Sequence, residues 1–178
     1  MIGEKTKNAM NNQIKNELES FYIYLSMGAF LSAHNLDGMA HWMRAQAHEE
    51  MIHAMKFYDH ILDRGGSVTL LDLKQLKTDW ESPLEVWKDT FDHEKFITGK
   101  IHGLLKIARE ENDYPAEPLL AWFVNEQIEE EKNAEKILRE MEMVGSSKDG
   151  LLMLDRELAA RVFVAGSPLN PADYKLAT

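Results

Sequence analysis

The chain has 178 residues, a length that suits one domain built around a single hydrophobic core. It contains no cysteine, which excludes disulfides, iron–sulfur clusters, thiolate zinc sites and cysteine nucleophiles, so any metal must be held by histidine, carboxylate or carbonyl groups. Its 30 acidic and 20 basic side chains give a formal net charge of −10, which opposes binding to nucleic acid or anionic lipid and favours small cations as ligands.

The N-terminal residues contain no apolar signal sequence, and no apolar run approaches the roughly 20 residues that a membrane-spanning helix needs. We therefore expect a soluble, cytoplasmic protein that binds neither membrane nor nucleic acid.

The first two predicted elements are long helices. Apolar residues recur at helical spacing over residues 5–33 without a proline or a turn cluster. Turn residues follow, with Asp37 as the expected N-cap of a second helix over 37–64, which Gly65 and Gly66 end.

A capping box predicts the start of the third helix. Ser82 stands at the N-cap, Pro83 at the first helical position and Glu85 at the third. We expect this helix to run to about residue 111.

The last two predicted helices differ in length. After a break near residue 113, a fourth helix is expected over 115–144, and the glycine and serines at 145–147 end it. A shorter apolar segment predicts a fifth helix over 151–160. The tail beyond it contains glycine and prolines, and we expect it to be irregular.

The segment 65–81 is too long for an ordinary loop. About 17 extended residues reach roughly 55 to 60 Å, which exceeds the length of roughly 42 Å of a helix of about 28 residues. This link can therefore cross the whole bundle, so that the second and third helices run parallel. Because no stretch has strand periodicity, the predicted fold class is all-α: a four-helix bundle with one long crossover and a short C-terminal fifth helix. We predict one domain over 1–160, followed by a tail of unknown role over 161–178.

A glutamate interrupts the apolar stripe of each long helix. Residues seven apart stay within about 20° of the same helix face. At this spacing each helix carries one glutamate near its middle, among apolar or aromatic residues. The four are Glu17, Glu50, Glu94 and Glu130. Helices laid side by side should bring the four carboxylates together inside the bundle.

Such a group of carboxylates needs compensating charge. Ionised carboxylates in an apolar interior are desolvated and repel one another. No lysine or arginine shares their stripes. Two divalent cations would balance four ionised glutamates, and His53 adds a nitrogen ligand on the face of Glu50. The pattern predicts a two-metal site, and Glu-x-x-His is an element of di-iron carboxylate bundles.

Other interpretations apply to single residues. Any one glutamate could be a solvated residue whose stem covers apolar neighbours, and a lone Glu-x-x-His is a weak signal. The metal hypothesis depends on the joint pattern. The other histidines show no metal-site pattern, and we expect them to be exposed polar residues. They are His34, His41, His48, His60, His93 and His102.

At these residues the sequence resembles the non-haem ferritins of prokaryotes, over about residues 2–160. The resemblance is carried by Glu49-Glu50-Met51-Ile52-His53, by His93-Glu94 and by Asn125-Glu126-Gln127-Ile128-Glu129-Glu130-Glu131-Lys132. It implies that iron is the metal. One iron would be held by Glu17, Glu50 and His53, and the other by Glu50, Glu94 and Glu130, with Glu50 bridging.

The resemblance implies further site residues. Gln127 would be a neighbour of the iron pair, and Tyr24 a hydrogen-bonding or redox-active neighbour. A third iron site would be formed by Glu49, Glu126 and Glu129, with Glu130 shared. The family assembles as a hollow homo-oligomeric shell of 24 subunits, in which the fifth helix would line the fourfold axes.

The implied function is iron storage with ferroxidase activity, an iron(II):oxygen oxidoreductase. Two adjacent Fe²⁺ ions can supply two electrons to O₂ or peroxide, and the Fe³⁺ produced hydrolyses to a mineral inside the shell. No haem is expected. Bacterioferritins carry a second Glu-x-x-His on the fourth helix, where this chain has Gln127-Ile128-Glu129-Glu130, and Met51 is most simply a packing residue.

Two other functions remain open. The bundle could be a small di-iron oxidase or peroxide scavenger that does not store iron. It could also be an interaction or structural bundle whose glutamates are surface charges. Particle mass separates storage from the first alternative, and aerobic oxidation of added Fe²⁺ separates it from the second.

Overall fold

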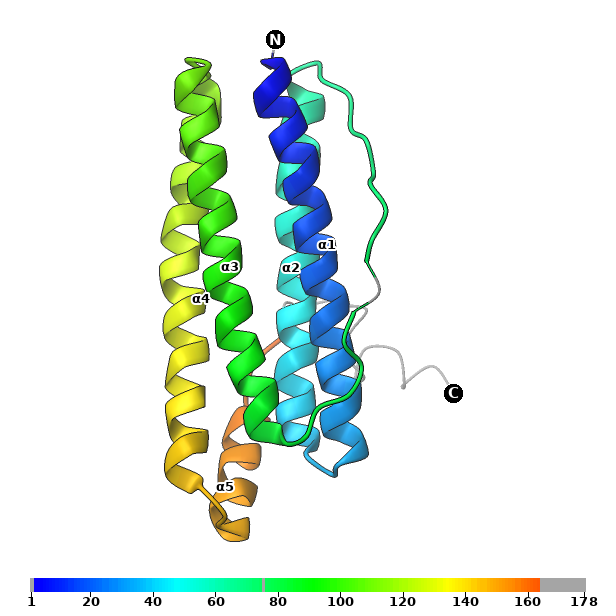
Figure 1. Cartoon of the computed structure of the whole chain (residues 1–178), viewed down its shortest axis with the longest axis vertical. Coiled ribbons are helices and arrows are strands. Elements are labelled where there is room, and N and C mark those ends of the chain that lie inside the picture. The colour runs from blue at the N-terminus through cyan, green and yellow to red at the C-terminus, as the bar shows by residue number, and fades with distance from the viewer. Residues whose placement is uncertain (1, 75, 164–178) are drawn as a thin grey trace.

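The computed structural model describes residues 2–74 and 76–163, and in this part of the chain all regular structure is helical (Figure 1). The four long helices are α1 (Glu4–Ala33), α2 (Asp37–Asp63), α3 (Pro83–Glu110) and α4 (Glu117–Val144). A 3₁₀ turn, η1 (Tyr114–Ala116), precedes α4, and a short helix, α5 (Lys148–Leu158), follows it. The predicted all-α bundle with a short fifth helix is confirmed. None of the helices in the described residues is long and apolar enough to cross a membrane.

The long link between α2 and α3 runs the length of the bundle beside α1 (Figure 1). Hydrogen bonds along its length fix it to α1. They include those from Thr69 N to Asn11 Oδ1 at 2.7 Å, from Lys74 N to Glu19 Oε1 at 3.0 Å, and from Ser26 Oγ to the Lys77 carbonyl at 2.9 Å. The link therefore returns the chain to the end where α2 began. As predicted, α2 and α3 run parallel, whereas α1/α2 and α3/α4 are antiparallel pairs.

The start of α3 agrees with the prediction, but the start of α2 does not. Ser82 is the N-cap of α3, and its Oγ accepts a hydrogen bond from Glu85 N at 3.2 Å. Asp37, predicted as the N-cap of α2, is instead its first helical residue, and its Oδ1 accepts from Ser32 Oγ at 2.9 Å. The first turn of α2 is capped from α5, because Met39 N donates to Asp155 Oδ1 at 2.8 Å. A local sequence pattern could not reveal a cap 116 residues away.

The boundaries of the last helices also differ from the prediction. Gly145, at φ +54°, ends α4 at the expected place. The next helix begins at Lys148 rather than at 151 and ends at Leu158 rather than at 160. Ser147 explains the earlier start, because its Oγ accepts from Gly150 N at 3.1 Å as an N-cap. Residues 164–178 of the predicted irregular tail lie outside the described residues.

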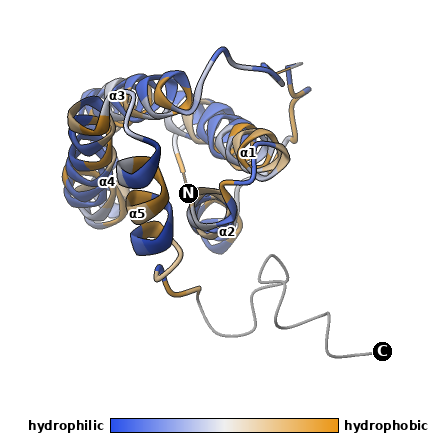
Figure 2. Ribbon diagram, turned by 90° about the horizontal axis from the view of Figure 1, so that it is seen from below, coloured by the Kyte–Doolittle hydropathy of each residue, from blue (hydrophilic) through white to orange (hydrophobic). Residues whose placement is uncertain are grey.

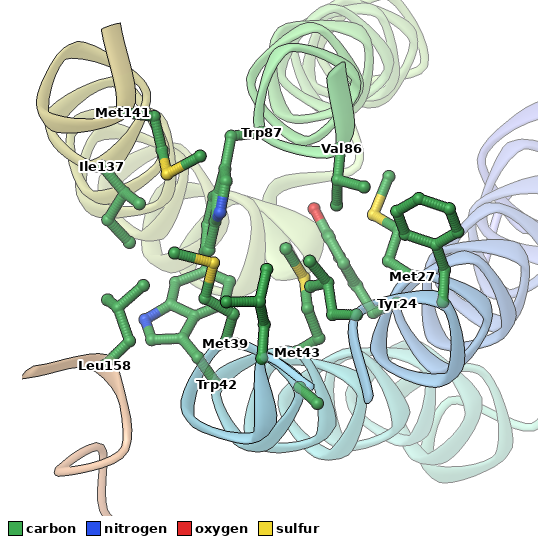
Figure 3. Packing of buried hydrophobic residues seen from close by; sticks show 14 of the residues in the cluster. Tyr24, Met27, Met39, Trp42, Met43, Val86, Trp87, Ile137, Met141 and Leu158 are labelled. Atoms are coloured by element: carbon green, nitrogen blue, oxygen red, sulfur yellow. The ribbon is translucent and has the colours of Figure 1, made fainter. Parts of the chain in front are cut away.

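The apolar core consists of two clusters, one toward each end of the bundle. In one cluster Trp42 packs edge-to-face on Trp87 with ring centroids 4.9 Å apart, among methionines from several helices (Figure 3). In the other, Phe57 stacks on Phe123 at 4.2 Å. Seen along the bundle, α5 lies at one end against α2 and α4 (Figure 2). The middle of the bundle, between the two clusters, is occupied by buried polar side chains.

Candidate metal centre

The four glutamates predicted to converge are all buried, one from each long helix. The exposed fractions are 1% for Glu17, 2% for Glu50, 2% for Glu94 and 5% for Glu130. Among the ion pairs formed by the described residues, no lysine or arginine reaches any of them. The interior of the bundle therefore contains an acidic layer without basic side chains other than histidine.

Glu17, Glu50 and His53 form one compact donor group in this layer. One ligand atom from each lies within 4.8 Å of the others. His53 Nδ1 is 3.5 Å from Glu50 Oε2, and Gln13 Nε2 donates to Glu17 Oε1 at 2.8 Å. The second oxygen of Glu17, Oε2, is buried without a hydrogen-bond partner. A buried, unpartnered carboxylate oxygen beside a carboxylate and an imidazole fits a divalent cation.

A second donor group shares His53. Ligand atoms of His53, Glu126 and Glu130 also lie within 4.8 Å of one another, and His53 Nε2 is 3.9 Å from Glu126 Oε1. The two imidazole nitrogens therefore face different carboxylates. Trp122 and Phe123 enclose the ring, each with its centroid 5.6 Å from that of His53.

Glu94 is held by Tyr24 and Gln127. The Tyr24 hydroxyl donates a short hydrogen bond to Glu94 Oε1, and Gln127 Nε2 donates to Oε2 at 3.3 Å. Within the described residues, Glu94 belongs to neither of the two compact donor groups. The structure thus brings Tyr24 and Gln127 onto the acidic layer, both through Glu94.

Two glutamines complete the layer, and sequence reasoning missed both. Gln46 Nε2 donates to Glu50 Oε1 at 3.0 Å and to Glu130 Oε2 at 2.9 Å, which ties α2 to α4. Gln13 holds Glu17 in the same way within α1. Each glutamine stands four residues before a glutamate, on the same helix face. This i,i+4 spacing is the signal that could have identified them.

Burial raises the pKa of most of these carboxyl groups. Desolvation, reinforced by the charge of Glu50, raises the pKa of Glu17 and of Glu94 to about 8. The pKa of Glu130 is also well above its usual range, first because of burial and then because of Glu94 and Glu50. Without a cation, these three groups hold protons near neutral pH.

Glu50 and His53 behave as an ion pair. Burial alone would raise the pKa of Glu50, but the hydrogen bond and charge of His53 outweigh it and lower that pKa. Burial likewise opposes the charged form of His53, yet Glu50, Glu17 and Glu130 raise its pKa to about 10. One protonated imidazole and several protonated carboxyl groups therefore keep the cation-free centre electrically balanced. Divalent cations would displace these protons.

The residues predicted for a third iron site line one cavity of about 390 Å³ between α2 and α4. They are Glu49, Glu126, Glu129 and Glu130. Glu49, however, is already paired, because its Oε2 lies 2.6 Å from Nη2 of Arg161. Burial raises the pKa of Glu49, and Arg161 opposes this shift. The four carboxylates share a cavity, but Glu49 faces a guanidinium rather than the other three.

The expectation that the other histidines are exposed is correct only for His34 and His102. His41, His48, His60 and His93 are half-buried. His93 Nε2 lies 2.8 Å from Ser20 Oγ, and His41 Nε2 lies 2.7 Å from the Arg161 carbonyl. His93 and His41 thus find polar partners on distant segments, which the pattern of a single helix does not reveal. Of the donor groups found in the described residues, none includes them.

Comparisons with known proteins agree over nearly the whole chain. The family model described as a ferritin-like domain matches residues 7–144. A bacterial non-heme ferritin from Bacteroides fragilis is 37% identical over 161 residues, which cover 90% of this chain and 100% of the relative. One from Staphylococcus aureus is 32% identical over 163 residues, covering 92% and 98%. Among solved structures, an open pore ferritin from the archaeon Archaeoglobus fulgidus has 40% identity and a TM-score of 0.89, covering 91% of this chain and 100% of that one.

Proposed function

The chain belongs to the ferritin family, and from this premise we propose that it stores iron and oxidises Fe²⁺ at a dinuclear site in the centre of the bundle. The observation that carries the proposal is the compact group of Glu17, Glu50 and His53, with its unpartnered oxygen on Glu17. Carboxylate and imidazole are ligands that Fe²⁺ accepts. Burying such a group in an apolar bundle costs free energy, which bound cations would offset.

In this proposal Glu17, Glu50 and His53 hold one Fe²⁺, and Glu50, Glu94 and Glu130 hold the other. Glu50 bridges the two ions. The hydrogen bonds from Gln46 to both Glu50 and Glu130 support this assignment, because one amide orients ligands of both positions. Tyr24 and Gln127 orient Glu94 in the same way.

Fe²⁺ is the substrate of the proposed reaction. Two Fe²⁺ ions give up one electron each, and O₂ takes up both electrons and two protons to form hydrogen peroxide. Peroxide can serve as the oxidant in its turn, because it accepts two more electrons and two protons to form water. Side chains of the layer hold the two ions adjacent, and the surrounding aromatic rings exclude water from the imidazole.

Storage requires a closed compartment, and we propose a homo-oligomeric shell of 24 subunits. The chain covers the full length of ferritin chains. Large apolar side chains are exposed on its described surface, as expected of residues that a neighbouring subunit covers. They include Tyr22, Phe96, Ile128, Met143, Met153 and Val162.

One titration tests the proposal. Fe²⁺ is added to the metal-free protein in air, and oxidation is followed by absorbance while particle mass is recorded. We expect rapid oxidation of the first two Fe²⁺ per chain and a particle of about 24 chain masses that retains the Fe³⁺. Oxidation at the buffer rate would refute the ferroxidase assignment. Rapid oxidation by a particle of a few chains that releases its Fe³⁺ would identify a di-iron oxidase without storage.

A further inference from the structure

Arg161 lies on the outer edge of the acidic layer, in the segment that follows α5. Its Nη2 is 2.6 Å from Glu49 Oε2, and its guanidinium carbon is 4.1 Å from the ring centroid of Trp42. The side chain is only 17% exposed. An arginine that is at once ion-paired, stacked on an aromatic ring and mostly buried has one defined position.

The backbone around Arg161 is anchored as well. The Arg161 carbonyl lies 2.7 Å from His41 Nε2, and Arg161 N donates to the Leu158 carbonyl at 3.3 Å. On either side, Leu158 and Phe163 are buried, and Phe163 packs edge-to-face on His41 with centroids 4.8 Å apart. These contacts hold the segment across α2 and direct the guanidinium onto Glu49.

The cavity beside Arg161 carries four glutamates and one other basic residue, Lys136, whose ammonium group pairs with Glu140 and Glu157. Glu126, Glu129 and Glu130 line it together with Glu49 and Arg161. Ligand atoms of Glu126 and Glu130 approach His53, whereas Glu49 is in neither of the compact donor groups of the described residues. The guanidinium stays charged at any accessible pH and cannot act as a metal ligand. A metal ion bound by Glu49 would have to break this ion pair and would lie close to a fixed positive charge.

We propose that Arg161 is an internal counterion that keeps Glu49 from binding metal, so that a divalent cation binds beside Glu49 only when Arg161 is displaced. The inference rests on the proposed function, because it concerns the metal capacity of a cavity that adjoins the dinuclear centre. While Arg161 is paired with Glu49, the chain therefore binds two ions tightly. The position of the segment that carries Arg161 determines whether a third ion can bind beside Glu49.

Arg161→Gln tests this proposal, because glutamine removes the charge and keeps a polar side chain. Anaerobic calorimetric titration with Fe²⁺ should count two tight ions per chain in the unaltered protein and three in Arg161→Gln. Crystals of both proteins loaded anaerobically with Fe²⁺ should show the added ion beside Glu49 by anomalous scattering at the iron edge. Neither measurement depends on oxidation.

Three further variants serve as controls. Arg156→Gln removes the same charge from an exposed position on α5 and should leave two ions. Glu49→Gln combined with Arg161→Gln should lose the third ion again. If Arg161→Gln loosens the segment, as circular dichroism and thermal melting would show, Arg161→Met still covers the Trp42 ring without charge and should gain the same ion.

The possible outcomes separate this inference from the proposed function. A third ion bound to Glu49 in the unaltered protein, or no added ion in either Arg161→Gln or Arg161→Met, would overturn the inference and leave the dinuclear site intact. An empty centre in every variant, with an ion gained beside Glu49 in Arg161→Gln, would refute the dinuclear assignment and support the role of Arg161.

Discussion

Asp113 and Glu94 are both buried carboxylates, but among the described residues Asp113 has a basic partner and Glu94 has none. Asp113, at the end of the bundle, receives two hydrogen bonds from the Arg64 guanidinium. Glu94, in the central layer, has only the neutral donors Tyr24 and Gln127. At the end of the bundle the acid stabilises the fold. In the centre no lysine or arginine among the described residues compensates the carboxylates, so a cation from solution can do so. This arrangement is expected where ion binding is the function.

The largest effect should follow from removing the basic partner at the end of the bundle. Arg64→Ala leaves Asp113 buried and unpaired, and we expect a loss of about 3 kcal/mol in the free energy of unfolding. Thermal or denaturant unfolding measures it, and added divalent cation should not restore the loss. The matched control is Arg109→Ala, which breaks an exposed ion pair with Glu117 and should cost no more than about 0.5 kcal/mol. Equal losses of unfolding free energy in Arg64→Ala and Arg109→Ala would contradict the stabilising role of the buried pair.

The next effect tests the centre directly. Glu50→Ala removes the proposed bridging ligand, and we expect the rapid oxidation of the first two Fe²⁺ per chain to slow by at least about 100-fold. Particle mass should not change, because Glu50 is buried inside the bundle and not on the surface where subunits would meet. Stopped-flow absorbance after mixing with Fe²⁺ in air measures the rate. Asp59→Ala, an exposed site on α2, is the control and should retain the normal rate.

The stability of the metal-free protein should fall as pH rises, whereas that of the cation-loaded protein should not depend on pH. The pKa of Glu17 and Glu94 rises from 4.5 to about 8 in the folded protein, and that of His53 from 6.5 to about 10. At pH values between the unfolded and the folded pKa of each group, the folded state therefore binds more protons than the unfolded chain. Its stability falls as pH rises through this range. We expect the Tm of the metal-free protein to fall by at least several degrees between about pH 5.5 and pH 8.5.

Scanning calorimetry at several pH values checks this dependence. Saturating Zn²⁺, which is redox-inert, should abolish it, because bound cations replace the protons. Glu94→Gln should flatten the profile of the metal-free protein, since it removes one of the groups that lose a proton. A stability that rises over the same pH range would show that the central carboxylates are already ionised.

The smallest of the expected effects concerns orientation within the centre. Gln46→Met removes the hydrogen bonds to Glu50 and Glu130 while preserving the volume of the side chain. We expect Fe²⁺ affinity to fall by about tenfold, the lower end of the range for residues that orient metal ligands. Anaerobic titration calorimetry measures it. An unchanged affinity in Gln46→Met would show that the ligands are oriented by packing alone.

Much of the fold and the central glutamates could be predicted from the sequence, because both follow from periodicity. A spacing of seven identifies the buried face of each helix, so Glu17, Glu50, Glu94 and Glu130 could be assigned to the interior. The length of the crossover then determined which helices run parallel. These properties are local or follow from chain geometry.

What could not be predicted depends on contacts between distant segments. Asp155 caps α2 from another helix, and Arg161 pairs with Glu49 across 112 residues of sequence. Gln46 was overlooked because a glutamine on a buried face has no periodicity of its own, although its position four residues before Glu50 was available. His93 was expected at the surface, but it reaches Ser20 on a neighbouring helix. Periodicity identifies the face on which a residue lies, not the partner that it meets there.

The central claim is that two divalent cations neutralise the buried acidic layer, and the most direct test is to locate them. Crystals loaded anaerobically with two Fe²⁺ per chain should give two anomalous peaks at the iron edge, both between the carboxylates of Glu17, Glu50, Glu94 and Glu130 and one of them bound to His53. Iron found only at the surface, with no ion between the four carboxyl groups and Glu50 still beside His53, would contradict this account.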